Sequence, residues 1–327
     1  MTTTATLTER RSLGGSDLRV ATLCLGGNVF GWSADERASH EVLDAYRAAG
    51  GNFVDTANTY SAWAPGNRGG ESETIIGRWM ASRGCRDDIV LATKVGYQAM
   101  EGQPAGLGRQ AVRGGLEASL RRLGTDRVDL YYLHRDDPAT PLEETLEALD
   151  ACVRAGQVRW SGLSNYSPAR VRRVMELCRD NGWAAPVAMQ PPYNLVDRAG
   201  FEGDLQRTCR DEGLGVAPYY SLARGFLTGK YRPGAALPAS ARAAAVANGY
   251  LTDRGFAVLA AADRVAAAHG ATPAQVALAW LAAQPTVVAP IASATRAEQV
   301  RELAGAGALR LAEDELAALR EAGESPV

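Results

Sequence analysis

The sequence predicts a (β/α)₈ barrel, formed by a single domain over residues 1–327, with an N-terminal β-hairpin and extra helices and loops at the C-terminal side. Three observations predict it: eight short apolar segments, a helical segment after each of them, and no break in composition that would mark a linker. Strand–helix alternation produces a parallel sheet covered by helices. Eight such units in 327 residues match the usual size of this barrel.

The predicted strands are short runs of mainly apolar residues, as expected where both faces of a parallel sheet are buried. They cover residues 20–25, 53–54, 89–93, 128–133, 158–163, 187–189, 215–217 and 287–291. Ahead of them, residues 13–20 contain Gly14, Gly15, Ser16 and Asp17, which are turn formers and predict a small hairpin.

The predicted helices have apolar residues at spacings of three and four, as Val42, Leu43 and Tyr46 do before Gly50. They cover residues 36–49, 71–80, 112–123, 142–155, 168–180, 204–212, 256–268, 273–283, a short stretch after Arg296, and 312–322. Residues 224–250 are rich in Gly, Pro, Ala and Arg and have little periodicity.

A doubly wound sheet is the competing fold. It would need a glycine-rich fingerprint directly after its first strand, and residues 25–31 lack that spacing. Residues 106–111 fit the pattern but lie in a loop far past their strand, and the loop at 225–230 is one residue short of a phosphate-binding P-loop. The barrel is therefore favoured.

Composition argues against several classes of partner and site. A net charge of −2 and a pI near 6.0 give no reason to expect nucleic acid or an anionic membrane as partner. The five cysteines are scattered and form no CxxC pair, which favours reduced thiols in the cytoplasm and argues against a zinc site or other metal. Residues 1–11 lack the apolar core of a signal peptide, and no run approaches the length of a membrane span.

Three neighbouring predicted strands end in a charged or titratable residue: Asp55, Lys94 and His134. They are 39 and 40 residues apart, about one strand–helix unit each. In such barrels the chemistry lies at the carboxyl ends of the strands. Tyr60 follows Asp55 in a polar loop and can reach the same end. These four residues are the predicted catalytic set.

Their chemistry is complementary. A lysine ammonium near Tyr60 is expected to lower the pKa of its phenol from about 10. Asp55 would keep Lys94 charged, and a neutral His134 would donate a hydrogen bond that orients a carbonyl oxygen. The set suits protonation of the oxyanion that forms when hydride adds to a carbonyl.

The motifs around these residues resemble those of the aldo-keto reductases. They are Phe53-Val54-Asp55-Thr56-Ala57-Asn58-Thr59-Tyr60, Leu91-Ala92-Thr93-Lys94-Val95-Gly96 and Asp129-Leu130-Tyr131-Tyr132-Leu133-His134. The resemblance extends over nearly the whole chain. It implies NADPH-dependent reduction of a small-molecule aldehyde or ketone, with Tyr60 as proton donor, Lys94 and Asp55 as its tuning pair, and His134 orienting the substrate.

The same resemblance implies a cofactor groove along the later strand ends. Ser164, Asn165 and Gln190 would bind the nicotinamide carboxamide, and Tyr219 would stack on its ring. The pyrophosphate segment contains Ser221, Leu222, Arg224, Gly225, Leu227 and Lys230, and the segment for the adenosine 2′-phosphate and adenine contains Ser293, Ala294, Thr295, Arg296 and Gln299.

Two positions in the last of these segments depart from the family pattern. The family often has Arg at the position of Thr295 and Asn at that of Leu303, so the choice of NADPH or NADH stays open. Arg296, close to a helix N-terminus, is in itself a suitable anion site.

Residues 63–70 resemble the subset of the family that is related to potassium-channel β-subunits and bacterial oxidoreductases. Trp32, Trp63 and Tyr97 lie in loops above the barrel and are the predicted substrate pocket. Residues 224–250 are interpreted as a lid over the cofactor.

Two other functions stay open. One is an aldolase-type barrel in which Lys94 forms a Schiff base. The other is a non-catalytic, NADP-sensing regulatory subunit. The sequence determines neither the substrate nor the oligomeric state.

Overall fold

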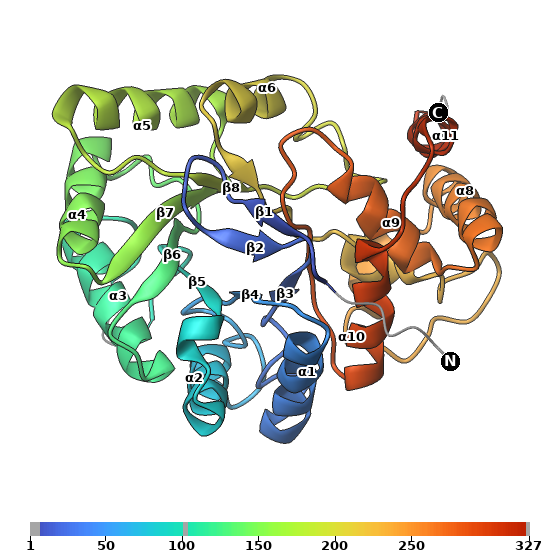
Figure 1. Cartoon of the computed structure of the whole chain (residues 1–327), viewed down its shortest axis with the longest axis horizontal. Coiled ribbons are helices and arrows are strands. Elements are labelled where there is room, and N and C mark those ends of the chain that lie inside the picture. Colours follow the sequence, from blue (N-terminus) through green and yellow to red (C-terminus); the bar gives the residue numbers. More distant parts are fainter. Residues whose placement is uncertain (1–6, 101–103, 325–327) are drawn as a thin grey trace.

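The computed structural model of the chain describes residues 7–100 and 104–324, which form a barrel of eight parallel strands surrounded by helices (Figure 1). Around the barrel the strands follow the order β10-β3-β4-β5-β6-β7-β8-β9. They span Cys24–Gly26 (β3), Phe53–Asp55 (β4), Val90–Val95 (β5), Val128–Leu133 (β6), Val158–Ser164 (β7), Ala188–Gln190 (β8), Gly215–Val216 (β9) and Ile291–Ala292 (β10). The predicted fold class is confirmed. The prediction about a signal peptide in residues 1–11 falls in part on residues 1–6, outside the described residues.

Backbone hydrogen bonds close the barrel between β9 and the segment before β10. Val216 forms a parallel bridge with Val287, and the Val288 N–H donates to the Val216 carbonyl at 2.8 Å. The last strand was expected at residues 287–291, but regular pairing is limited to Ile291–Ala292. The reason is Pro290, which has no N–H to donate to a neighbouring strand.

An antiparallel hairpin, β1 (Arg10–Ser12) and β2 (Arg19–Ala21), precedes the barrel as predicted. Its side chains Leu13, Leu18 and Val20 are buried in one cluster with the inward-facing barrel residues, so the hairpin plugs the barrel. Residues 20–25 were expected to form one strand, and this is wrong. The chain bends between β2 and β3 because β2 pairs with the hairpin while β3 pairs with β4.

Gly14 shows how tightly the hairpin sits on the barrel. It has φ +55°, and a Cβ there would lie 2.1 Å from the Val187 carbonyl oxygen and 2.8 Å from the Gly215 nitrogen. Only glycine adopts this conformation without strain and leaves room for that backbone.

Helices follow the strands, and the ends of the predicted helices lie within three residues of their expected positions. The short helix at Ala243–Gly249 lies in the stretch of little periodicity and was not predicted. They span Glu36–Ala48 (α1), Glu71–Arg83 (α2), Arg109–Leu123 (α3), Leu142–Arg154 (α4), Pro168–Asn181 (α5), Asp204–Asp211 (α6), Ala243–Gly249 (α7), Asp253–His269 (α8), Pro273–Ala282 (α9), Ala297–Ala304 (α10) and Glu313–Ala322 (α11), with short 3₁₀ turns at Arg86–Asp88 (η1), Ala223–Thr228 (η2) and Gly305–Gly307 (η3). None of the helices within residues 7–100 and 104–324 has the length and apolar character that crossing a bilayer requires.

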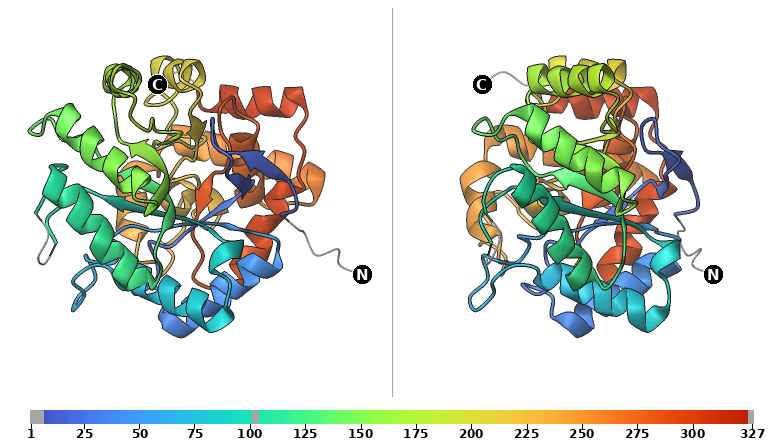
Figure 2. Two further views of the ribbon diagram at one scale, coloured as in Figure 1. Left: turned by 60° about the vertical axis from the view of Figure 1, so that its left-hand side comes forward. Right: turned by 90° about the vertical axis from the view of Figure 1, so that its left-hand side faces the viewer.

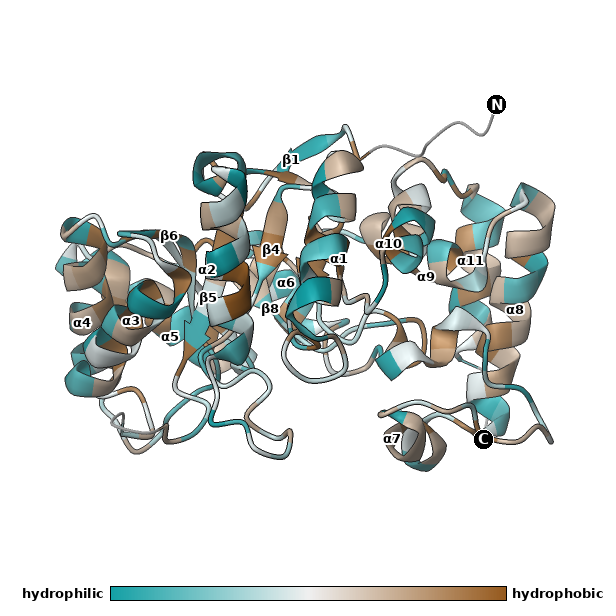
Figure 3. Cartoon of the chain, turned by 90° about the horizontal axis from the view of Figure 1, so that it is seen from below, coloured by the Kyte–Doolittle hydropathy of each residue, from teal (hydrophilic) through white to brown (hydrophobic). Residues whose placement is uncertain are grey.

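Two apolar cores follow from the two-residue period of the strands. Along β5 and β6, Ala92, Leu130 and Tyr132 pack inside the barrel, whereas Leu91 and Tyr131 pack outward against the helices. Figure 3 shows the outer partners, with hydrophobic and hydrophilic residues mixed along α1 and α2. The side views place the hairpin at one end of the barrel and the long loops with α7 at the other (Figures 2 and 3).

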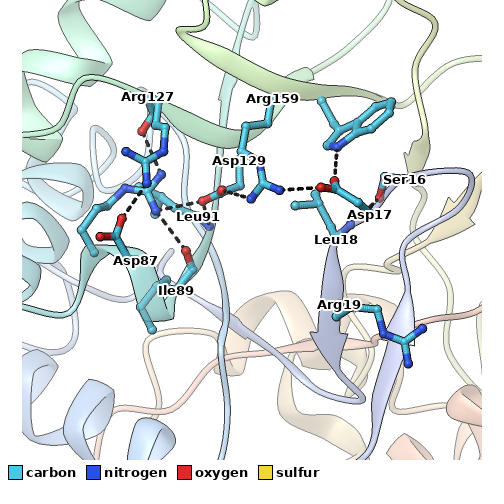
Figure 4. Close-up of polar contacts among 12 residues, drawn as sticks. Ser16, Asp17, Leu18, Arg19, Asp87, Ile89, Leu91, Arg127, Asp129 and Arg159 are labelled. Atoms are coloured by element: carbon cyan, nitrogen blue, oxygen red, sulfur yellow. Dashed lines mark hydrogen bonds and ion pairs between the residues drawn. The ribbon is translucent and has the colours of Figure 1, made fainter.

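A charge network ties the hairpin to the strands at the plugged end (Figure 4). Asp129, at 3% exposure, accepts from Arg159 at 2.9 Å and from the Leu91 N–H at 2.9 Å, and pairs with Arg86 at 2.9 Å. Arg159 also pairs with Asp17 of the hairpin at 2.9 Å. Each buried carboxylate oxygen of Asp129 therefore has a cationic partner.

Replacing Asp129 with alanine is expected to lower the free energy of unfolding by about 3 kcal/mol, because Arg86 is left with an uncompensated, largely buried charge. Urea unfolding followed by circular dichroism measures it. The control is Arg37→Ala, which breaks an exposed ion pair with Glu41 within α1 and should cost about 0.5 kcal/mol or less. Equal losses in the two variants would contradict a structural role for the Asp129 network.

Candidate active site

The ends of β4, β5 and β6 bring Asp55, Lys94 and His134 to the loop end of the barrel. Asp55 is the last residue of β4 and Lys94 the last but one of β5, and both are inside the barrel wall with 1% and 0% exposure. His134 follows β6 directly, and its N–H donates to the Val95 carbonyl at 2.8 Å. A turn after β4 returns Tyr60 to the same place, with its N–H donating to the Ala57 carbonyl.

The Lys94 ammonium is the centre of this group. Its Nζ donates to Asp55 Oδ2 at 2.6 Å, to the Thr56 carbonyl at 2.8 Å and to Tyr60 Oη at 2.9 Å. These three bonds use all three N–H donors of an ammonium. The Tyr60 hydroxyl in turn donates to Asp55 Oδ2 at 3.2 Å. Carboxylate, ammonium and phenol therefore form one closed hydrogen-bonded unit.

Burial lowers the pKa of Lys94, and the neighbouring Asp55 carboxylate opposes that shift. The expectation that Lys94 lowers the pKa of Tyr60 is not met. Burial, followed by the Asp55 charge, raises the pKa of Tyr60 well above 10. The reason is that the phenol is desolvated and faces the carboxylate as well as the ammonium. Tyr60 is therefore a neutral phenol that holds its proton at physiological pH.

His134 lies across from Tyr60, with a distance of 6.1 Å between the ring centroids. Burial, the Lys94 charge and the Arg135 charge lower its pKa well below 6.5, so the imidazole is neutral at pH 7. Its buried Nδ1 has no hydrogen-bond partner among the described residues. A neutral imidazole retains one N–H donor for a ligand.

Aromatic rings surround these residues at the mouth. Trp63 packs 6.2 Å from Tyr60 and 5.6 Å from Trp32, and Tyr97 packs 4.9 Å from His134, between ring centroids. Trp63 and Tyr97 are 51% and 44% exposed, unusually high for such side chains. The structure thus brings together the three residues predicted to form a substrate pocket, while their contact with a substrate stays a prediction.

Side chains at or just after the ends of β7, β8 and β9 continue the hydrogen-bond network from Asp55 and His134. The Gln190 side-chain amide donates to Asp55 Oδ1 at 3.0 Å, and the Ser164 hydroxyl donates to the Gln190 carbonyl at 2.9 Å. Asn165 donates to the His134 carbonyl and accepts from the Tyr219 hydroxyl at 2.8 Å. Asn165 also donates to the Ser164 hydroxyl at 3.0 Å, so the four residues expected to bind the nicotinamide are connected to one another and to the Asp55 carboxylate.

The loop after β9 has an unusual backbone. Tyr220, Ala223 and Arg224 have φ of 56°, 49° and 58°, and Gly225 has φ of 98°. Left-handed conformations at non-glycine residues are costly and tend to mark ligand-binding segments. Within it, the Ser221 hydroxyl donates to the Pro218 carbonyl, Leu222 is half-buried and Leu227 is buried.

Three cations of residues 224–250 lie close to this loop: Arg224, Lys230 and Arg242. Their charged groups lie 4.4 Å from the Tyr220 ring, 5.4 Å from the Tyr231 ring and 5.7 Å from the Trp32 ring, respectively. Among residues 7–100 and 104–324, no carboxylate forms an ion pair with any of them. Burial, followed by the charge of Arg242, lowers the pKa of Lys230. Clustered cations without anionic partners suit the phosphates of a dinucleotide.

Arg242 was missed by sequence reasoning, because it lies in a stretch without periodicity. Lysine usage is a signal that could have drawn attention to this loop. The chain has 35 basic residues, of which only Lys94 and Lys230 are lysines. Both lie in the site described here, whereas the ion pairs on the outside of the barrel use arginine, as Arg83 and Arg232 do.

The second predicted phosphate segment lies at the end of β10. The Ser293 hydroxyl donates to the Asn28 side chain at 2.7 Å, and the Thr295 N–H donates to the Gln299 side chain at 2.8 Å. Arg296 is the N-cap residue of α10 and is exposed, and Ala294 is buried. Within the described residues, no hydrogen bond or ion pair joins this segment directly to Asp55, Tyr60, Lys94 or His134.

Comparison with known proteins identifies the family. The sequence profile of the aldo/keto reductase family matches residues 22–324. A probable voltage-gated potassium channel subunit beta of Arabidopsis thaliana is 33% identical over 301 residues, which cover 90% of this chain and 89% of that protein. The uncharacterized oxidoreductase YrpG of Bacillus subtilis is 35% identical over 301 residues, with the same coverage. The L-glyceraldehyde 3-phosphate reductase of Escherichia coli is 34% identical over 307 residues, covering 90% and 86%. With this profile match over most of its length and these relatives, the chain belongs to the aldo/keto reductase family.

Proposed function

We propose that this protein is an NADPH-dependent reductase that converts an aldehyde or ketone into an alcohol. Family membership and the oxidoreductase names among its relatives support an oxidoreductase. The observation that carries the finer proposal is the position of Tyr60 Oη, 2.9 Å from Lys94 Nζ and beside a neutral His134. This is the donor arrangement that proton delivery to a carbonyl oxygen needs.

Each residue has a separate role in the proposed reaction. His134 donates a hydrogen bond to the carbonyl oxygen and fixes its orientation. Tyr60 exchanges its hydrogen bond with Asp55 for one with the substrate and delivers its proton to that oxygen. Lys94 stabilises the tyrosinate left behind, and Asp55 keeps Lys94 charged. When bound, the reduced nicotinamide supplies the hydride that adds to the carbonyl carbon.

The residues present fit a dinucleotide. Tyr219 is half-exposed and held by Asn165, so its ring face can support a flat group. Arg224, Lys230 and Arg242 provide positive charge for a pyrophosphate. Exposed Arg296 supports a preference for the 2′-phosphate of NADPH over NADH, which a direct comparison of the two reductants tests.

The Schiff-base alternative is disfavoured by the surroundings of Lys94. A Schiff base requires a free amine with a lone pair, whereas Lys94 Nζ donates three hydrogen bonds and pairs with Asp55 at 2.6 Å.

A regulatory subunit is the second candidate, because one relative is named as a potassium channel subunit. Binding of NADPH without turnover on any aldehyde, ketone or keto-sugar would favour it. All five cysteines are free thiols, which supports the proposed location in the reducing cytoplasm.

Tyr60→Phe should lower kcat by ~10²–10⁴-fold, because it removes the proton donor and leaves the ring in place. NADPH absorbance with a panel of carbonyl compounds measures kcat. The Kd of NADPH from fluorescence is expected to stay within about threefold of wild type, since the variant keeps the ring and changes none of the residues assigned to the cofactor. The control is Tyr131→Phe, a tyrosine on the outward face of β6 whose hydroxyl donates to the Val112 carbonyl. Unchanged kcat in Tyr60→Phe would exclude Tyr60 as the donor.

Reduction should show no acid limb near the usual histidine pKa of about 6.5, because His134 titrates well below it. On the alkaline side the rate should fall as Lys94 loses its proton, with a midpoint below the usual lysine pKa of about 10.4 because burial lowers it. The kcat/KM profile of wild type and His134→Asn measures both. An acid limb near pH 6.5 that disappears in His134→Asn would show that the imidazole titrates in its ordinary range.

Arg242→Met should weaken NADPH binding by ~10–100-fold, the usual range for loss of one charge-assisted contact. Fluorescence titration measures the Kd. Arg232→Gln is the matched control, since Arg232 belongs to the same segment but pairs with Asp263. Equal NADPH affinities of Arg242→Met and Arg232→Gln would exclude a phosphate contact by Arg242.

A further inference from the structure

The first turn of α2 places two polar residues behind the catalytic strands. Ser72 and Glu73 have 0% exposure. Acidic residues in a first helical turn usually lie at the surface, where they complement the helix dipole. Here Glu73 points into the layer between α2, α3 and β5 instead. The burial of the Glu73 carboxylate at this position must therefore be explained by the contacts that it makes.

Ser72 is connected to Lys94 by hydrogen bonds through one intermediate residue, Thr56. Its hydroxyl donates to the Gly27 carbonyl at 2.8 Å and shares a hydrogen bond of 2.8 Å with the Thr56 hydroxyl. The carbonyl of Thr56 accepts the bond from Lys94 Nζ at 2.8 Å. Ser72 therefore holds the backbone that provides one of the three acceptors of the ammonium.

Glu73 reaches Lys94 through the neighbouring strand residue. The Thr93 hydroxyl donates to Glu73 Oε1 at 2.5 Å, and Arg122 Nε donates to Oε2 at 2.6 Å. Thr93 faces outward from β5 while Lys94 faces inward, as the two-residue period requires. Holding the Thr93 side chain therefore restrains the rotation of β5 that would swing Lys94 away from Tyr60.

Stability alone does not explain this arrangement. Buried ion pairs are often no more stabilising than apolar residues of similar volume. Glu73 also adds a second negative charge near Lys94: burial lowers the pKa of that lysine, and the charges of Asp55 and Glu73 both raise it.

We propose that Ser72 and Glu73 are positioning residues, which hold Lys94 against Tyr60 through Thr56 and Thr93. The turnover part of this inference rests on the proposed reductase function. The geometric part concerns Lys94 itself and can be measured without cofactor or substrate.

The chain offers an unusually direct readout, because it contains only two lysines. With ¹³C-labelled lysine, NMR should show two side-chain signals, and Lys230→Arg assigns them. Lys94 faces Asp55 on β4, Cys24 on β3, Tyr132 on β6, the loop residues Tyr60 and His134, and, behind the strand, Glu73 with its partner Arg122. In Glu73→Gln only one of these charges is removed. The signal of Lys94 should then titrate at lower pH than in wild type, since the ammonium loses a stabilising charge.

Thr93→Val distinguishes the effect of the position of Lys94 from the effect of the Glu73 charge, because it removes the Thr93 hydroxyl and leaves that charge in place. Both variants should lower kcat by ~10–100-fold, since small displacements of catalytic groups have effects of this size. NADPH affinity should stay within about threefold of wild type, since neither variant touches the residues assigned to the cofactor. The matched control is Arg83→Gln, which breaks an ion pair between α2 and Asp44 of α1 and touches neither β5 nor Lys94. It should leave kcat and the Lys94 titration unchanged.

The proposal is overturned if Glu73→Gln and Arg83→Gln give the same Lys94 titration, or if Thr93→Val keeps the wild-type kcat. Should Glu73→Gln fail to fold, Thr93→Val with Ser72→Ala still decides, because each removes one hydroxyl from its own path to Lys94. If wild type reduces no carbonyl compound, the reductase proposal fails. The Lys94 NMR signal of Thr93→Val, in which the Glu73 charge is kept, then tests the positioning by itself, and an unchanged signal overturns it.

Discussion

The ion pair between Lys94 and Asp55 is the interaction on which the site depends. Both side chains are almost completely inaccessible, and burying two charges is favourable only when geometry and further hydrogen bonds compensate the lost hydration. Here the compensation is complete for Lys94, whose three N–H groups each have an acceptor, and Asp55 also accepts from Gln190 and Tyr60. The pair holds the phenol in place and, through Gln190, connects it to the residues proposed to bind the nicotinamide.

The two ends of the barrel differ: one contains the interactions that stabilise the fold, and the other contains the polar residues of the candidate active site. At the plugged end, Asp129 and its arginines join strands and hairpin, and apolar hairpin side chains complete the inner core. At the other end, strands finish in polar residues, loops carry exposed aromatic rings, and Arg224, Lys230 and Arg242 form no ion pair with any carboxylate that the structure describes. Tight packing at one end permits the desolvated charges and left-handed backbone at the other.

The two kinds of basic residue are used differently. Arginine, with its planar fork, suits the ion pairs between helices, and the chain uses it at 33 of its 35 basic positions. Lysine is a compact charge whose pKa shifts readily on burial. Lysine is present only at positions 94 and 230. At position 94 a compact charge fits beside the phenol of Tyr60, 2.9 Å from its hydroxyl oxygen.

The sequence by itself determined the barrel, its helices and the meeting of Asp55, Lys94 and His134, because apolar strands of regular spacing bring their carboxyl ends to one edge. It also identified Tyr60, which lies a short loop away. Only the tertiary structure decided the bend between β2 and β3, the inward turn of Glu73 and the approach of Arg242 to Trp32. It also reversed the expected direction of the Tyr60 pKa shift. The physical reason is the same in each case: these features depend on desolvation and on contacts between residues distant in the chain, and local pattern contains neither.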